Sequence, residues 1–470
     1  MSTTLINQAA PGRSEGAQPG VRYLRPGDEG FTEAGTAWNR LGSHQPAVIA
    51  MAAHPEHVVQ AVRYARASGL GVGVMATGHG TGNAVRGGML INTSAMQGLS
   101  VDPVTATARV QAGVSWETLN ARAARHGLFG LQGSNSIVGV VGYSLGGGFG
   151  WLGRHYGFAA QSIVSAELVT ADGELLTVSE SNHPDLFWGL RGSAGNLGVV
   201  TSLELRLVDL DVVYGGALYY PLADAHRVLT EYRDWAVRQP DELASSATLI
   251  NFPPLPFLPD HLRGRSFACV RVCYSGDNLA PGVAAVRELR HCLGAPLIDE
   301  VRRMPALELD QISAEPREPL AAVIHSELVE DLTPDVIAAL VREQTADSPL
   351  LFVEARQLGG ALRVPAEQLS PLNRTGSGFS VNAAGLAVTP ELHAASEAKL
   401  HALAQRLEPL ADGVGYVNFL EGAEGAARIR SAYSDADWER LVELKTRWDP
   451  QNVFRFNRNI PPRTGAMSPA

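Results

Sequence analysis

Cysteine is scarce in this sequence, and long apolar runs are missing from it. Three cysteines, Cys269, Cys273 and Cys292, stand among 470 residues, without the paired spacing or histidine neighbours of a zinc site. We predict core thiols in a reducing compartment and no metal site. No stretch reaches the ~20 apolar residues of a membrane span, and the N-terminus lacks the basic and apolar regions of a signal peptide. A cytoplasmic protein is therefore expected.

Basic residues are outnumbered by acidic ones. The 38 lysines and arginines against 48 aspartates and glutamates give a formal net charge of −10. The sequence therefore lacks the excess of positive charge that binding to nucleic acid or an anionic membrane requires. With 45% hydrophobic residues, the chain is long enough for a large core divided among more than one folding unit. We expect a small-molecule partner, and the sequence leaves the oligomeric state open.

The order of apolar patterns predicts an α+β protein with two main units. The first unit mixes short strands with amphipathic helices such as 54–66. The second unit has strands and helices that suit one antiparallel sheet with helices on one side. The predicted divisions are an N-terminal extension over 1–40, the first unit over 41–210 and the second unit over 211–414. A C-terminal return to the first unit covers 415–463, and a mobile tail covers 464–470.

Two segments are too rich in glycine to be ordinary connectors, ATGHGTG at 76–82 and GSNSIVGVVGYSLGGGFG at 133–150. Glycine lets consecutive N–H groups converge on a phosphate or a flat ring without a basic side chain. A flexible turn or a tight packing contact is the alternative for the second run. A dinucleotide fold of the Rossmann type is a poor fit, because the glycine-rich turn does not link a first strand directly to a helix.

His79 stands between Gly78 and Gly80, directly after an apolar strand. A histidine in a loop is usually solvated or hydrogen-bonded, but further motifs accompany it in order. They are GVVGYSLGGGFGWLGRHYG, LVTADGELLTVSESNHPDLFWGLRGSAGNLGVVT, YVNF and DPQNVFRFNRNIPP. With ATGHGTG, these motifs resemble the berberine-bridge-enzyme-like oxidases of the vanillyl-alcohol-oxidase, or PCMH-type, flavoproteins. The resemblance spans about Ala47 to Pro462.

This resemblance implies a PCMH-type FAD-binding domain over 41–210 and a substrate domain over 211–414. It also implies a covalent bond from His79 to the flavin 8α carbon, although Thr77 and Gly80 depart from the family's usual loop. Asn135 replaces the cysteine that forms a second link in many members. The expected attachment is therefore through His79 alone, as in single-link members such as the enterocin favorskiiase. Val138 resembles a valine that accompanies oxygen reactivity, so O2 is the expected electron acceptor.

We therefore predict a cofactor site built from both glycine loops, the loop 192–200 and the C-terminal segment. Its members are Ala76, Thr77, Gly78, His79, Gly80, Thr81, Gly82, Gly133, Ser134, Asn135, Val138, Gly139, Gly142, Tyr143, Gly146, Gly147, Gly148, Gly198, Val199, Asn418, Asn457 and Asn459.

Substrate handling is assigned to two further places. Glu354 and Arg356 lie two apart in LLFVEARQL, so a strand would project both from one face. By resemblance Glu354 is a general base, and a half-exposed salt bridge is the alternative. Tyr416 is a second catalytic candidate that would share a strand face with Asn418, unless it is a buried tyrosine with a satisfied hydroxyl. Thr248 stands where favorskiiase-like members carry tyrosine. This difference weakens the expectation that the chain acts on the same substrate as those members.

The expected reaction is oxidation of a small organic molecule from specialised metabolism, with hydride transfer to flavin N5 and reoxidation by O2. A flavin oxygenase that rearranges a polyketide-like substrate is one alternative. A non-catalytic flavin-binding protein is the other.

Overall fold

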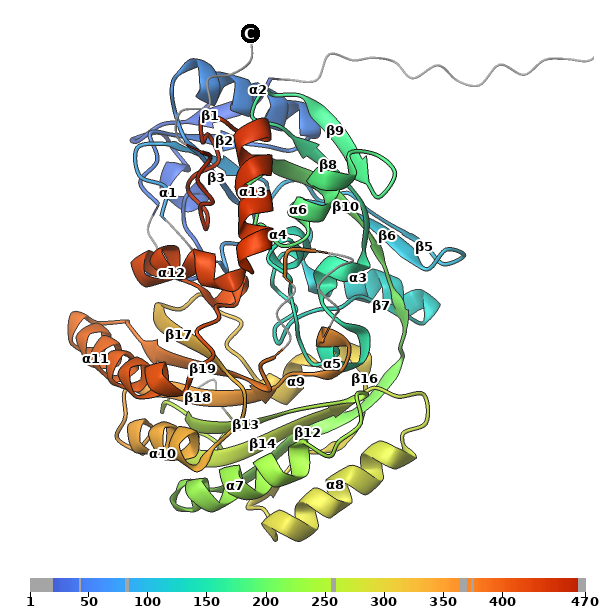
Figure 1. Cartoon of the computed structure of the whole chain (residues 1–470), viewed down its shortest axis with the longest axis vertical. Coiled ribbons are helices and arrows are strands. Elements are labelled where there is room, and N and C mark those ends of the chain that lie inside the picture. Colours follow the sequence, from blue (N-terminus) through green and yellow to red (C-terminus); the bar gives the residue numbers. More distant parts are fainter. Residues whose placement is uncertain are drawn as a thin grey trace, which may run out of the picture.

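The computed structural model describes residues 20–41, 44–80, 84–254, 259–363, 370–372 and 376–463, with the side chains of 422–424 left aside. Residues 1–19, the tail 464–470 and two predicted cofactor residues, Thr81 and Gly82, lie outside these ranges. Figure 1 shows two halves, with the amino-terminal and carboxy-terminal segments together in the upper half.

The upper half holds two principal sheets within the described ranges. The first has the order β1 (Arg22–Leu24), β2 (Val48–Met51), β4 (Met89–Asn92) and β3 (Val72–Met75), with β2, β4 and β3 parallel. The second is antiparallel, with the order β5 (Leu99–Asp102), β6 (Thr107–Gln111), β10 (Val199–Arg206), β8 (Ile163–Val169) and β9 (Leu175–Ser179). The short strands β7 (Leu128–Phe129) and β11 (Val208–Asp209) pair beside them.

Helix α2 (Pro55–Ala67) joins these sheets into one core. Proline at its first position has no N–H to satisfy, and Val58, Val62 and Ala65 recur at helical spacing on the buried face. The other helices of this half before residue 200 are α1 (Phe31–Ala34), α3 (Trp116–Ala123), α4 (Val140–Leu145) and α6 (Pro184–Leu190), while α5 (Gly153–Tyr156) packs against the lower half. The segment predicted as an extension, 1–40, thus supplies β1 and α1.

The lower half is built on one antiparallel sheet. Its order among the described residues is β15 (Ile298–Asp299), β12 (Val212–Pro221), β14 (Ser266–Tyr274), β13 (Leu243–Asn251), β18 (Leu350–Gln357), β19 (Phe379–Leu386) and β17 (Ala322–Val329), with β16 (Arg302–Pro305) also on β12. Helices α7 (Ala225–Ala236), α8 (Ala280–Leu293), α10 (Pro334–Glu343) and α11 (Pro390–Leu407) cover its outer face (Figure 1). The predicted one-sided arrangement is confirmed.

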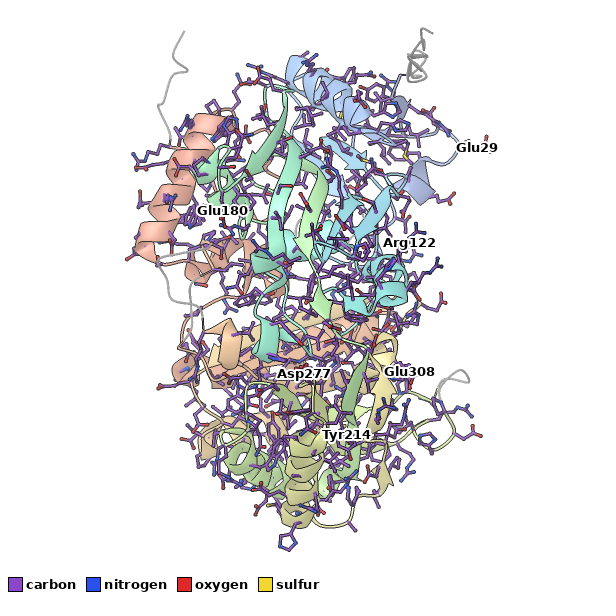
Figure 2. All side chains as sticks on the ribbon, turned by 90° about the vertical axis from the view of Figure 1, so that its right-hand side faces the viewer. Glu29, Arg122, Glu180, Tyr214, Asp277 and Glu308 are labelled. Carbon is purple, nitrogen blue, oxygen red and sulfur yellow. The ribbon has the colours of Figure 1, made fainter. Side chains whose placement is uncertain are left out.

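The inner face of this sheet is turned toward the upper half. Val353 and Ala355 of β18 pack under the outer helices, so Glu354 and Arg356 project to the opposite face, as the alternation of a strand requires. Helix α9 (Asp310–Ser313) lies between the halves (Figure 1). In the side view of Figure 2, Glu308 shortly before α9 lies where the halves meet.

The carboxy-terminal segment returns to the upper half through α12 (Gly422–Arg428) and α13 (Asp435–Trp448). One detail of the prediction is wrong here. Tyr416 and Asn418 do not share a strand face, because 417–419 forms a 3₁₀ turn. Asn457 lies in a bend, and Asn459 follows it without regular secondary structure. Apolar alternation over three or four residues fits a strand and a tight turn equally well, and here tertiary contacts select the turn.

The three cysteines have free thiols, and Cys269 and Cys273 are fully buried in β14. Burial raises the pKa of both thiols, to about 12 for Cys269, so they behave as core residues. None of the helices in the described ranges combines the length and apolar character needed to span a bilayer.

Candidate active site between the two halves

The first glycine loop follows directly from β3 and is held against the N-terminal segment. Gly78 has φ of +73°, and a Cβ atom there would lie 2.7 Å from the Cα of Ala37. Its carbonyl accepts a 3.0 Å hydrogen bond from the N–H of Trp38. The close approach and the left-handed backbone both require glycine, and they fix the residue that follows.

His79 is clamped on two sides. Its imidazole stacks on the Trp38 ring, with centroids 4.8 Å apart, and its Nδ1 lies 2.9 Å from the Thr77 hydroxyl. Its Nε2 is buried and has no hydrogen-bond partner among the described residues. Burial lowers the pKa of the imidazole to about 4. His79 is therefore neutral at physiological pH, with one ring nitrogen uncommitted.

Thr77 brings the two glycine loops together. Its hydroxyl also accepts the N–H of Gly139, at 3.3 Å, and a Cβ at Gly139 would touch Thr77 and Ala76. Gly139 is the residue before α4, and Val138 beside it accepts the N–H of Trp116. The two motifs that are about sixty residues apart in sequence thus form one continuous wall.

Several buried polar atoms along this wall lack partners within the described ranges. Buried polar groups are normally hydrogen-bonded, so several buried polar atoms without partners in one place indicate a polar ligand. The loops are tied to 193–196 by the bond from Ala194 N–H to the Leu145 carbonyl. The orphans on these connected segments are His79 Nε2, Tyr143 Oη, Ser144 Oγ, Ser193 Oγ and Asn459 Oδ1. Such a set of donors and acceptors fits a large polar cofactor such as FAD.

The triple glycine of the second loop serves packing. A Cβ at Gly146 would lie 1.9 Å from the Asn418 Oδ1, and one at Gly148 would lie 2.3 Å from the Tyr143 ring. Gly147 and Gly148 also have φ of +107° and +72°. Tight packing and left-handed backbone explain these three residues without a ligand, while the direct contact of each with the cofactor stays a prediction.

Gly142 differs from this run, because a Cβ there would meet nothing within 4 Å. We expect Gly146→Ala to lower the free energy of unfolding by about 1–3 kcal/mol through overpacking against Asn418. Gly142→Ala, in α4, is the matched control and is expected to be neutral or stabilising by up to ~1 kcal/mol. Urea unfolding of the cofactor-free proteins measures both, and equal midpoints would contradict the packing role.

Tyr416 and Asn418 hold the triple-glycine segment from the carboxy-terminal side. The Tyr416 hydroxyl accepts the N–H of Gly148 at 2.8 Å, and the Asn418 amide donates to the Tyr143 carbonyl at 2.9 Å. Burial raises the pKa of Tyr416, so its hydroxyl stays protonated. This geometry is that of a buried tyrosine with a satisfied hydroxyl, which was the predicted alternative for Tyr416. A role of Tyr416 as a base stays a prediction.

Glu354 lies in a buried cluster of charges and is not half-exposed. Its carboxylate is 3.1 Å from Arg356 and 3.4 Å from Arg271, and it accepts the Ser246 hydroxyl at 2.8 Å. Burial alone would raise its pKa, but the two guanidinium groups and Ser246 outweigh burial and hold the pKa low. Glu354 is therefore a stable anion whose lone pairs are engaged.

Arg356 connects this cluster to the upper half. It donates to the Ser134 hydroxyl at 2.7 Å and lies over the Trp151 ring, 4.4 Å from its centroid. The predicted pair Glu354 and Arg356 is thus in contact with the second glycine loop. The sequence pattern alone could not predict this contact, because the two segments are far apart in the chain. Thr248 also faces Glu354, at 3.4 Å.

The remaining predicted residues occupy different surroundings. A Cβ at Gly198 would lie 2.3 Å from Leu168, so its small size serves packing against β8, and Val199 is buried at the start of β10. Gly133 packs on the Tyr143 ring and Gly80 is exposed. Asn457 donates to the Ala194 carbonyl at 3.3 Å. Whether these residues touch a cofactor stays a prediction.

Sequence reasoning missed four charged residues that the structure places at or behind this site. They are Arg271, Asp310, Glu315 and Lys445. Arg271 alternates with Cys269 and Cys273 on one strand face, and a charge between two core thiols was a usable signal. No local pattern pointed to the other three residues.

Two family models match this chain. The FAD binding domain covers residues 46–179, and the domain described as berberine and berberine like covers residues 415–461. The (R)-6-hydroxynicotine oxidase of Paenarthrobacter nicotinovorans is 28% identical over 93% of this chain and 96% of its own length. The resemblance to berberine-like flavoproteins is confirmed, whereas the particular likeness to the enterocin favorskiiase stays a prediction.

Solved structures agree on the fold. The 6-hydroxy-D-nicotine oxidase from Arthrobacter nicotinovorans matches with a TM-score of 0.81 and 24% identity, over 96% of this chain and 100% of that one. Xylooligosaccharide oxidase from Myceliophthora thermophila, in complex with xylobiose, matches with a TM-score of 0.81 and 22% identity, over 94% and 97%. The predicted α+β, PCMH-type fold is confirmed.

Proposed function

We propose that this chain is a berberine-bridge-enzyme-like FAD-linked oxidoreductase that oxidises a small organic molecule with a largely apolar body, and its matches to the FAD binding domain and to the berberine and berberine like domain support this. The observation that carries the proposal is the uncommitted, buried Nε2 of His79 on a wall of unsatisfied polar atoms. We propose that this nitrogen forms the single covalent bond to the flavin, at its 8α carbon. Asn135, whose amide donates to the Pro316 carbonyl at 3.0 Å, cannot form a thioether.

Bound FAD would supply a two-electron acceptor at N5, with O2 as the terminal oxidant. The chain's own residues would orient the substrate and exclude water. Tyr416 offers a neutral hydroxyl whose position is fixed by Gly148. Beside it, a small cavity of about 40 Å³ is lined mainly by apolar side chains, among them Phe149, Phe158 and Leu328.

The apolar lining supports a compact substrate over an oligosaccharide. Rings and aliphatic groups gain about 25 cal/mol per Å² on burial, whereas sugar hydroxyls need polar partners along an extended groove. The hydroxynicotine relative acts on a compact heterocycle by its name, and the xylooligosaccharide oxidase is a contrasting case within the same fold. A role in specialised metabolism and a cytoplasmic location stay predictions.

The test is anaerobic bleaching of the FAD-loaded protein. We expect the visible flavin absorbance to fall with a member of a panel of compact amines and secondary alcohols, 6-hydroxynicotine included, and to return on admission of air. Xylobiose and chitooligosaccharides are the contrasting probes. Bleaching by the sugars alone would overturn the proposed substrate class, and no uptake of FAD at all would overturn the function. Bound FAD that no probe bleaches would instead support a non-catalytic flavin protein.

Oxygenation with rearrangement is separated from oxidation by labelled O2. Thr248, at the place of a tyrosine in favorskiiase-like members, is turned into the charge cluster, where Arg271 donates to it at 3.2 Å. We therefore expect peroxide and no label in the organic product. Label in the product would favour the oxygenase alternative.

A further inference from the structure

The segment 310–317 is fixed to the upper half at several points. The Asp310 carboxylate accepts the N–H and hydroxyl of Ser136, at 3.0 and 2.5 Å. At the other end, the Arg317 carbonyl accepts the indole N–H of Trp38 at 3.2 Å, and Trp38 is the residue stacked on His79. The segment therefore runs beside the proposed flavin attachment site.

The same segment is also fixed to the lower half. Arg271 of β14 donates to the Ser313 carbonyl at 3.0 Å, and the Trp151 indole donates to the Ser313 hydroxyl at 3.0 Å. Ala314 follows with φ of +50°, a left-handed turn that few non-glycine residues adopt without support from their surroundings. Glu315 is thus carried by a backbone whose neighbours on both sides are held in place.

Glu315 lies close to the charge cluster of the inner sheet face, within electrostatic range of Arg271, Arg356 and Glu354. Its side chain keeps a large exposed surface, yet protein surrounds it closely enough for burial to be the main cause of a raised pKa. The carboxyl group of Glu315 is therefore accessible and is at the same time close to the charge cluster. Within the described ranges no hydrogen bond or ion pair involves its carboxyl group, in contrast to the fully engaged Glu354.

The charges facing Glu315 form an incomplete cluster. Glu354 is one anion between two cations, Arg271 and Arg356, so these three groups carry one positive charge in excess. An ionised Glu315 makes the cluster neutral, and a protonated Glu315 leaves it cationic. Burial, Glu354 and Asp310 raise the pKa of Glu315 against the lowering by the two arginines. The titratable and charged groups that act on it or share its segment are Tyr143, Arg271, Asp310, Arg317, Glu354 and Arg356.

We propose that Glu315 is the proton acceptor of the oxidation, and that Glu354 is a positioning residue that holds Arg271 and Arg356. This inference rests on the proposed function. In the step, the substrate's O–H or N–H bond breaks and its proton bonds to the Glu315 carboxylate. The adjacent C–H bond also breaks, its hydrogen passes with the electron pair as hydride to the flavin oxidant, and the substrate becomes C=O or C=N. Glu315 ends the step protonated and uncharged, with the substrate oxidised by two electrons.

The first experiment needs no substrate. We expect infrared difference spectra of the FAD-loaded protein, between about pH 5 and pH 8, to contain a protonated carboxyl band that Glu315→Gln removes. Glu318→Gln, at an exposed residue directly after this segment, is the matched control and should retain the band. A spectrum of Glu315→Gln identical to the wild type would overturn the proposal, whatever the fate of the proposed function.

The second experiment follows flavin bleaching by whichever panel compound the wild type oxidises. Because the ionised carboxylate is the active form, the wild-type rate should rise with pH through the raised pKa. Glu315→Gln should lose about 10²-fold or more and the pH step with it. Glu315→Asp should retain the step at a reduced rate, which separates proton transfer from misfolding.

Glu354→Gln distinguishes the two carboxylates. Since the charge of Glu354 raises the pKa of Glu315, its removal should move the pH step to lower pH without abolishing it. Loss of the step in Glu354→Gln together with its retention in Glu315→Gln would assign proton acceptance to Glu354 and overturn the inference.

Discussion

Replacing Lys445 with methionine is expected to lower the free energy of unfolding by about 3–5 kcal/mol. Lys445 and Asp449 form a 2.7 Å ion pair at the end of α13, and both side chains are 0% exposed. The ammonium group also donates to the carbonyls of Asn196 and Phe454, at 2.9 and 3.0 Å. Methionine preserves the bulk but leaves Asp449 as a buried charge without its counterion.

The same pair positions the proposed cofactor segment. Asp449 accepts the N–H groups of Val453 and Phe454, at 2.7 and 2.9 Å, and the chain continues from there to Asn457 and Asn459. Lys445→Met should therefore also lower the retention of FAD. This second effect follows from the loss of a fixed backbone and needs no contact between Lys445 and the cofactor.

Urea unfolding followed by circular dichroism measures the first effect, with Lys399→Met as the control. Lys399, whose side chain is 36% exposed, forms a 3.1 Å pair with Glu343, and Arg406 stays on that carboxylate at 2.7 Å when Lys399 is replaced, so a loss of about 0–1 kcal/mol is expected. A shift for Lys445→Met no larger than that of Lys399→Met would show that the buried pair is not needed for stability.

Removing the imidazole of His79 should abolish covalent attachment of the flavin while leaving a folded protein. The proposed nucleophile is the uncommitted Nε2, and the depressed pKa of about 4 keeps the ring neutral and nucleophilic at physiological pH. Below that pKa the protonated ring has no free lone pair. Attachment should therefore proceed throughout the neutral range and fail only in strong acid.

Acid precipitation gives a direct measurement. The wild-type pellet should stay yellow after washing, and the His79→Ala pellet should be colourless with the flavin left in the supernatant. His126→Ala, an exposed histidine far along the chain, should remain yellow. A colourless wild-type pellet would remove the covalent link from the proposed function but not the FAD itself.

Local pattern was sufficient for some elements and failed for others. The alternation in LLFVEARQL placed Glu354 and Arg356 on one face of β18, because a strand has a fixed period of two. Alternation over YVNF predicted a strand as well, and the structure has a 3₁₀ turn at 417–419. The difference lies in length, since a long alternating run is specific and a four-residue run is not.

The triple glycine illustrates a second kind of ambiguity. Its composition indicated either a phosphate cradle or close packing, and both uses select glycine for the same lack of a Cβ. Only the positions of Tyr143 and Asn418, from an adjacent helix and from the distant carboxy-terminal segment, show how closely Gly146 and Gly148 are packed.

The sequence by itself determined the resemblance to berberine-like flavoproteins, the one-sided antiparallel sheet of the second unit, and the identity of the histidine on the first glycine loop. These features depend on residue types at short, fixed spacings. Tertiary structure alone decided the electrostatics of the site. Glu354 is an engaged anion, and Glu315 is a carboxyl group without a hydrogen bond among the described residues, because Arg271, Arg356, Ser246 and Ser313 come from separate segments. Charge and burial act through space, and the spacing of residues along a chain does not encode those distances.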